Sequence, residues 1–191
     1  MGVLTAAVAG LRTTVARKAA LLRHIWRPNR FKALLEQFSG RWSMPAARQA
    51  LILAKPPVGI DAPMVGLRSR DAIEARINLL RDEAAATPLS NIEFDLLDAI
   101  LQVRDRVPAA LNSLRDIADE MPSIGPALVQ VEVRMEALSA RGVAVDTLDF
   151  EVSYGRSSME YYDGFVFGLY AEGRPDLPAV ANGGRYDALT L

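Results

Sequence analysis

The sequence contains no cysteine and a single histidine, His24. Disulfide bonds and thiolate metal sites are therefore excluded, and one histidine cannot build a metal site from several imidazoles. No metal site is predicted. Proton-transfer or nucleophilic chemistry that needs a histidine is not expected either, because His24, close in sequence to Arg23 and Arg27, is most simply a surface residue.

Long hydrophobic runs are also missing. No stretch approaches the roughly 20 apolar residues that span a bilayer, so no membrane association is predicted. The opening Met1 to Leu11 is apolar but lacks the positive start of a secretory signal. An arginine-rich, acid-free start resembles an organellar transit peptide. However, apolar residues recur at helical spacing and favour an amphipathic helix of a folded, cytoplasmic domain; they are Leu4, Val8, Leu11, Val15 and Leu22.

Charge is balanced overall but not along the chain. The 22 basic and 23 acidic residues give a net charge of −1, yet residues 1–40 contain Glu36 as their single acid. Such a basic segment indicates either a surface for nucleic acid or an acidic partner, or a solvated helix face, and the second interpretation is favoured. The basic residues are Arg12, Arg17, Lys18, Arg23, Arg27, Arg30 and Lys32.

From the start to about Gly142 the sequence predicts successive helices. Half of the 191 residues are apolar, which is enough for a core. Ser90 followed by Glu93 is a capping-box pattern, and Pro108 and Pro126 lie near predicted helix starts. The apolar stripes are interpreted as core-facing surfaces, with no cofactor motif among them, so no cofactor is predicted. One stripe consists of Ile73, Ile77, Leu80 and Ala84.

After Gly142 the apolar period changes from three or four to two. Leu148, Phe150, Val152 and Tyr154 alternate with polar residues, as in a strand. We expect antiparallel strands at about 147–156, 160–171 and 179–182, arranged as a meander. The predicted class is α+β, with a mostly helical region at 1–145 followed by a sheet segment at 146–191.

Two segments of the sheet half carry a family resemblance. They are Glu160-Tyr161-Tyr162-Asp163-Gly164-Phe165-Val166-Phe167 and Asn182-Gly183-Gly184-Arg185-Tyr186-Asp187. In this order, about fifteen residues apart, they resemble the histidine-binding signature of histidyl-tRNA synthetases. The resemblance implies that the sheet is part of a class II synthetase-like fold, with the helices before it corresponding to that family's helical insertion.

The resemblance also implies a ligand pocket. It assigns histidine contacts to Tyr162 and Tyr186, with Asn182, Gly183 and Gly184 close by, and supporting positions at Glu160, Tyr161, Gly164 and Arg185. Strand alternation separately places Tyr162 and Gly164 on one face, and Tyr161, Phe165 and Phe167 on the other. An aromatic ring with a hydroxyl tip suits a flat, hydrogen-bonding ligand such as an imidazole. The alternative is that these tyrosines simply pack the sheet.

One position departs from the synthetase pattern. Synthetases have a catalytic arginine five residues before the second tyrosine of the pair, and this sequence has Ser157 there. Without that cation, transition-state charge is not stabilised. The resemblance therefore implies the family's non-catalytic branch. Such a protein binds histidine and regulates a separate short-form ATP phosphoribosyltransferase, with a homo-oligomeric parent protein and no role for nucleic acid.

Two other hypotheses remain. The chain is a fragment of a true synthetase whose basic helix touches tRNA, or a helical interaction domain with a coincidental sheet. In either family reading the chain is expected to be a fragment, because the earlier class II motifs and a later glycine-rich motif with its arginine are not visible in it.

Overall fold

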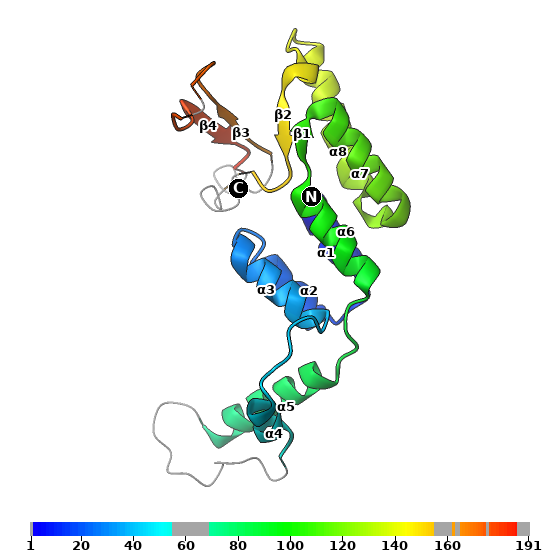
Figure 1. Cartoon of the computed structure of the whole chain (residues 1–191), viewed down its shortest axis with the longest axis vertical. Coiled ribbons are helices and arrows are strands. Elements are labelled where there is room, and N and C mark those ends of the chain that lie inside the picture. Colours follow the sequence, from blue (N-terminus) through cyan, green and yellow to red (C-terminus); the bar gives the residue numbers. More distant parts are fainter. Residues whose placement is uncertain (1, 55–68, 155–161, 163–164, 175, 187–191) are drawn as a thin grey trace.

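A computed structural model describes residues 2–54, 69–154, 162, 165–174 and 176–186 (Figure 1). Its α-helices are α1 Val3–Gly10, α2 Val15–Arg23, α3 Pro28–Phe38, α4 Ala46–Leu53, α5 Arg70–Ala85, α6 Asn91–Gln102, α7 Val107–Glu120 and α8 Gly125–Ser139. Two short 3-10 helices are η1 Pro122–Ile124 and η2 Val145–Thr147. The strands are β1 Arg104–Arg106, β2 Asp149–Glu151, β3 Val166–Leu169 and β4 Ala181–Gly184.

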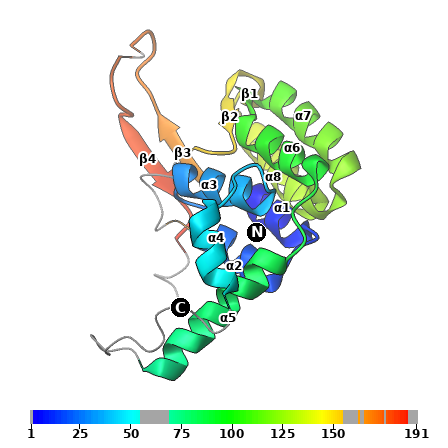
Figure 2. The ribbon, with the colours of Figure 1, turned by 60° about the horizontal axis from the view of Figure 1, so that its bottom comes forward.

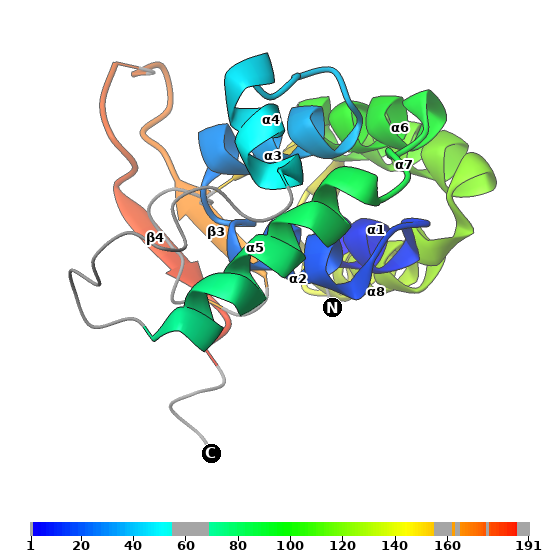
Figure 3. The same cartoon turned by 90° about the horizontal axis from the view of Figure 1, so that it is seen from below.

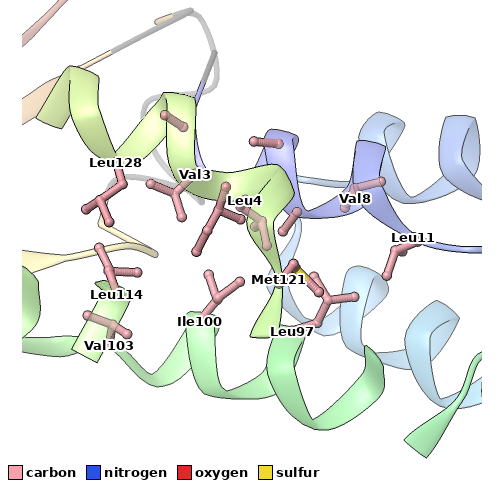
Figure 4. Close-up of a cluster of buried hydrophobic side chains, with 14 of the residues drawn as sticks. Val3, Leu4, Val8, Leu11, Leu97, Ile100, Val103, Leu114, Met121 and Leu128 are labelled. Carbon is pink, nitrogen blue, oxygen red and sulfur yellow. The ribbon is translucent and has the colours of Figure 1, made fainter. Parts of the chain in front are cut away.

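The hydrophobic core forms around α1, which has no charged residue and is therefore buried on most sides. Side chains from α6, α7 and α8 surround it (Figure 4). The end of α1 packs closely on η1, because a Cβ added to Gly10 would collide with the Ser123 side chain. The labelled core residues in Figure 4 are Val3, Leu4, Val8, Leu11, Leu97, Ile100, Val103, Leu114, Met121 and Leu128.

The single N-terminal helix expected from Leu4 to Leu22 is wrong, because the chain turns between α1 and α2. Thr14 begins α2 as its N-cap, and its side-chain oxygen accepts a hydrogen bond from the backbone N–H of Arg17. Because α1 and α2 are separate helices, the apolar residues from Leu4 to Leu22 do not all lie on one buried face. Leu21 is fully buried, whereas Val15 is 84% exposed.

The predicted helix ends of the central bundle are confirmed. Ser90 and Glu93 form the complete capping box at the start of α6, and Pro108 and Pro126 lie in the first turns of α7 and α8. Gly142 follows α8 with a φ of +82°, a left-handed conformation that glycine adopts without steric cost.

The apolar stripe of α5, predicted to face the core, does not face it. None of its described side chains is buried; Ile73, Ile77 and Leu80 are half-buried and Ala84 is exposed. Helices α4 and α5 form an arm that projects from the bundle (Figure 1) and lies in front of α3 and α2 when the molecule is seen from below (Figure 3). The stripe is therefore covered by one short neighbouring helix, not by the core.

The predicted three-stranded meander is also wrong in its pairing. Each predicted strand range contains or overlaps a strand, but β2 pairs antiparallel with β1, and β3 pairs antiparallel with β4, in two separate two-stranded sheets. Strand β1 has no apolar signal that could predict it, because its residues are Arg-Asp-Arg. Opposite charges instead face each other across the pair, Arg104 opposite Glu151 and Arg106 opposite Asp149.

Strand β2 attaches to the helical bundle while the β3–β4 hairpin stands to one side of it (Figure 2). Leu148, Phe150 and Val152 pack against the core, as their alternation predicted. Because β1 lies between α6 and α7, the β1–β2 pair joins the sheet segment to the helical region.

Candidate ligand-binding site

The β3–β4 hairpin aligns the two motif segments. Gly168 lies opposite Asn182, Val166 opposite Gly184, and Phe167 opposite Gly183. Directly opposite residues of antiparallel strands point to the same side, and successive residues alternate. One side of the hairpin therefore carries Val166, Gly168, Asn182 and Gly184, which we call the asparagine face; the other carries Phe167 and Gly183, which we call the phenylalanine face.

Tyr162 lies on the asparagine face. A Cβ built on Gly184 would come within 2.8 Å of two Tyr162 ring carbons and of the Phe165 carbonyl oxygen. The absence of a side chain at Gly184 thus admits the tyrosine ring against the backbone of β4. This brings two of the ligand residues predicted from the sequence into contact.

The phenylalanine face is packed by aromatic rings. A Cβ on Gly183 would lie 2.5 Å from the Phe167 ring, and the centroids of Phe165 and Phe167 are 6.0 Å apart. The guanidinium carbon of Arg134, from α8, lies 4.8 Å from the Phe165 ring centroid, a cation–π contact that ties this face to the bundle. Gly183 thus contributes space for Phe167 on this face.

Sequence reasoning missed Tyr154 and Tyr170. The Tyr154 hydroxyl donates to the Asn182 side-chain oxygen at 3.1 Å, and the Tyr170 hydroxyl donates to that of Tyr154 at 3.2 Å. A Cβ on Gly168 would collide with the Tyr154 hydroxyl. Burial, with added contributions from Tyr170 and Glu151, raises the pKa of Tyr154 to about 12, so the phenol stays protonated at neutral pH.

The remaining predicted positions are only partly described. Arg185 continues the strand pairing, its backbone N–H donating to the Phe165 carbonyl at 2.8 Å, and Tyr186 follows with 37% exposure. Glu160, Tyr161 and Gly164 lie outside the described residues, as does Ser157. The meeting of Tyr162 with Tyr186 stays a prediction.

The rest of the described chain offers other polar features. An open groove of about 820 Å³ is lined by residues of α7, α8 and η2, among them the ion-paired Arg115 and Glu132, and by none of the predicted ligand residues. Within the described ranges, no group of three or more metal-ligating side chains is placed to hold an ion. His24 ends α2; burial, then Arg30, Arg27 and Arg23, lower its pKa.

The basic N-terminal segment is not uniformly solvated. Arg17 is 5% exposed and its guanidinium binds the end of α5, while the Lys18 ammonium donates to the Ala9 carbonyl at the end of α1. Two cations of this segment therefore make hydrogen bonds that hold helices together. None of the helices in residues 2–54 and 69–154 combines the length and apolar character that a membrane span requires.

Comparison with known proteins identifies the family. The histidyl-tRNA synthetase family model matches residues 68–190, which is well over half of the chain and includes both hairpin motifs. The chain belongs to the histidyl-tRNA synthetase family.

Two of its curated relatives carry the same name. It is 29% identical over 185 residues to the ATP phosphoribosyltransferase regulatory subunit of Agrobacterium fabrum, covering 83% of this chain and 48% of that protein. It is 33% identical over 116 residues to the protein of the same name from Brucella anthropi, covering 60% and 31%. The chain thus spans about half or less of the relatives it matches. No solved structure matches it.

Proposed function

We propose that this protein is a non-catalytic regulatory subunit of ATP phosphoribosyltransferase, which binds histidine and controls the first step of histidine biosynthesis. The observation that carries the proposal is the strand pairing of the two motif segments, which puts Tyr162 against Gly184 on the face that also carries Asn182. The shared name of the curated relatives supports the same role.

The chemistry of the asparagine face suits a small polar aromatic ligand. Tyr162 offers a ring for stacking and a hydroxyl, and the Asn182 amide offers hydrogen-bonding groups. Gly184 leaves backbone accessible beside them. Tyr186 and Arg185 complete the site that the family resemblance implies, and Glu160, Tyr161 and Gly164 support it. Gly183, which the resemblance also implies, lies on the phenylalanine face against Phe167. Histidine combines a flat imidazole with a carboxylate and an ammonium group, which these groups can distinguish from an aliphatic amino acid.

Loss of catalysis follows from Ser157. Amino-acid activation by synthetases of this family uses an arginine at that position, and a serine hydroxyl cannot stabilise the developing negative charge to the same degree. The whole protein should therefore show no histidine-dependent ATP–pyrophosphate exchange and should charge no tRNA. Clear exchange, in a preparation free of host synthetase, would instead favour the alternative of a true histidyl-tRNA synthetase, which the family match keeps open.

Regulation is tested with the partner present. The partner is the short-form ATP phosphoribosyltransferase catalytic subunit, and the proposed regulatory protein is a homo-oligomer in the cytoplasm. Mixing the two purified proteins should produce a complex whose phosphoribosyl transfer is inhibited by histidine, because the two sites are coupled. A catalytic subunit that is equally active and equally histidine-insensitive with and without this protein would refute the proposal.

A further inference from the structure

Tyr154 does not belong to the hairpin, yet it reaches across one face of it. It follows β2 by three residues, and its hydroxyl lies where a side chain at position 168 would otherwise project. There it donates to Asn182, which is 28 residues further along the chain. The hydroxyl of Tyr170 in turn donates to Tyr154. Three polar side chains from three segments thus form one hydrogen-bonded row on the asparagine face.

This row fixes the orientation of the Asn182 amide. The Tyr154 phenol is protonated at neutral pH and donates its hydrogen to the Asn182 side-chain oxygen at 3.1 Å. The amide nitrogen is then the group left to face outward. An isolated asparagine on a strand would rotate between presenting its oxygen and its NH₂ group, because the two ends are nearly equal in size. The tyrosine removes that freedom.

We infer that Tyr154, oriented by Tyr170, is a positioning residue of the ligand site, which holds Asn182 so that its NH₂ group donates to the bound ligand. This inference rests on the proposed histidine-binding function. It specifies the ligand group that meets Asn182 as a hydrogen-bond acceptor. Histidine has two such acceptors, its carboxylate and the unprotonated nitrogen of its neutral ring.

The hydrogen bond between Tyr154 and Asn182 requires a glycine at position 168. Gly168 sits opposite Asn182 in the register, and a Cβ there would displace the Tyr154 hydroxyl and come within 3.0 Å of the Asn182 side-chain oxygen. Leu169, the next residue, points to the other face and is exposed, so it does not touch the row. Leu169→Ala therefore serves as the control for changes to the hairpin itself.

The test is calorimetric titration of the whole protein with histidine and with histidinol, which lacks the carboxylate. Tyr154→Phe keeps the ring and removes the hydroxyl, so histidine should bind about 2- to 10-fold more weakly, the equivalent of one net hydrogen bond. Tyr170→Phe should weaken binding less, and Leu169→Ala should leave it unchanged. In an Asn182→Ala background, Tyr154→Phe should have no further effect, because its action passes through the amide.

Histidinol identifies the acceptor. If Tyr154→Phe weakens histidine but not histidinol, Asn182 meets the carboxylate; equal weakening of both ligands assigns it to the ring nitrogen. Wild-type affinity in Tyr154→Phe, or additive losses with Asn182→Ala, would overturn the inference and leave a Tyr154 that only fastens the hairpin. Failure of the wild-type protein to bind histidine at all would instead overturn the proposed function, and this inference with it.

Discussion

Replacing Arg17 by methionine removes the charged group that joins α2 to the end of α5. The guanidinium donates to the Glu83 carboxylate at 2.7 Å and to the Thr87 carbonyl at 2.7 Å, with longer bonds to the carbonyls of Glu83 and Ala86 at 3.2 and 3.4 Å. It also lies 5.0 Å from the Phe38 ring centroid. Arg17 thus donates to carbonyls at and just beyond the end of α5, where the helix runs out of backbone donors.

The loss of stability depends on the acceptors that Arg17→Met leaves without a donor. Removing one partner of a buried ion pair typically destabilises by about 3–5 kcal/mol, because the other charge and its acceptors stay unpaired. The Glu83 side chain is 29% exposed, so water recovers part of that loss. Methionine also fills much of the aliphatic volume of arginine. We therefore expect the free energy of unfolding to fall by about 3 kcal/mol, the low end of the range.

Urea unfolding followed by circular dichroism measures this loss. Arg30→Met is the matched control. This arginine is exposed on α3, and it makes no ion pair with any other residue that the structure describes. Its replacement should therefore change the free energy of unfolding by less than about 0.5 kcal/mol. Arg17→Lys should fall between, because an ammonium cannot reproduce the planar fork that reaches carboxylate and carbonyl together. Equal stability of the two methionine variants would refute the interpretation of Arg17 as the anchor of α5.

Three further changes test the site and the helix cap. Tyr162→Phe should weaken histidine binding by on the order of 1–3 kcal/mol, roughly 5- to 150-fold, if its hydroxyl meets the ligand in a dry pocket; Tyr161→Phe should matter far less, and equal small effects in calorimetry would contradict the assignment. Gly184→Ala should weaken histidine affinity on the order of tenfold, because the new Cβ meets a carbonyl oxygen and the Tyr162 ring at 2.8 Å; unchanged affinity would show that this close packing is dispensable. Burial alone raises the pKa of Glu93, but hydrogen bonds from the Arg12 backbone and the capping serine outweigh it and lower that pKa from 4.5. Its contribution to stability is therefore present above about pH 4.5 and lost as the pH falls through the lowered value, so Glu93→Gln should flatten the acid side of the stability–pH curve, and an unchanged acid side would argue against it.

Short-range sequence patterns predicted the helix ends of the central bundle. The capping box needs only Ser90 and Glu93, which exchange hydrogen bonds at 3.1 Å within one turn. Gly142 and the prolines at 108 and 126 act on their own backbone dihedrals. Such interactions are complete within a few residues, so the sequence contains all the information they require. The expected single N-terminal helix failed because its spacing did not reveal the competing cap at Thr14.

The sequence named candidate ligand residues, whose role stays a prediction, but it did not give their arrangement. Motif order assigned Tyr162, Asn182 and Gly184 to one neighbourhood. The hairpin register puts Asn182 and Gly184 on one face, and the Tyr162 ring packs against Gly184. Tyr154 and Tyr170 were not recognised, because alternation marked Tyr154 only as the last apolar position of a strand. Its role depends on where the chain returns after the turn beyond β2.

By itself the sequence determined the helix ends of the central bundle, the switch to strand spacing after Gly142 and the family motifs, since each depends on neighbouring residues. Only the tertiary structure decided the strand at Arg104–Arg106, the burial of Arg17 and the Tyr154–Asn182 hydrogen bond. Each of these depends on a partner 28 or more residues away: Asn182 for Tyr154, Glu83 for Arg17 and β2 for β1. A charged residue is exposed or buried according to whether folding brings it an acceptor, and that is fixed by packing rather than by residue type.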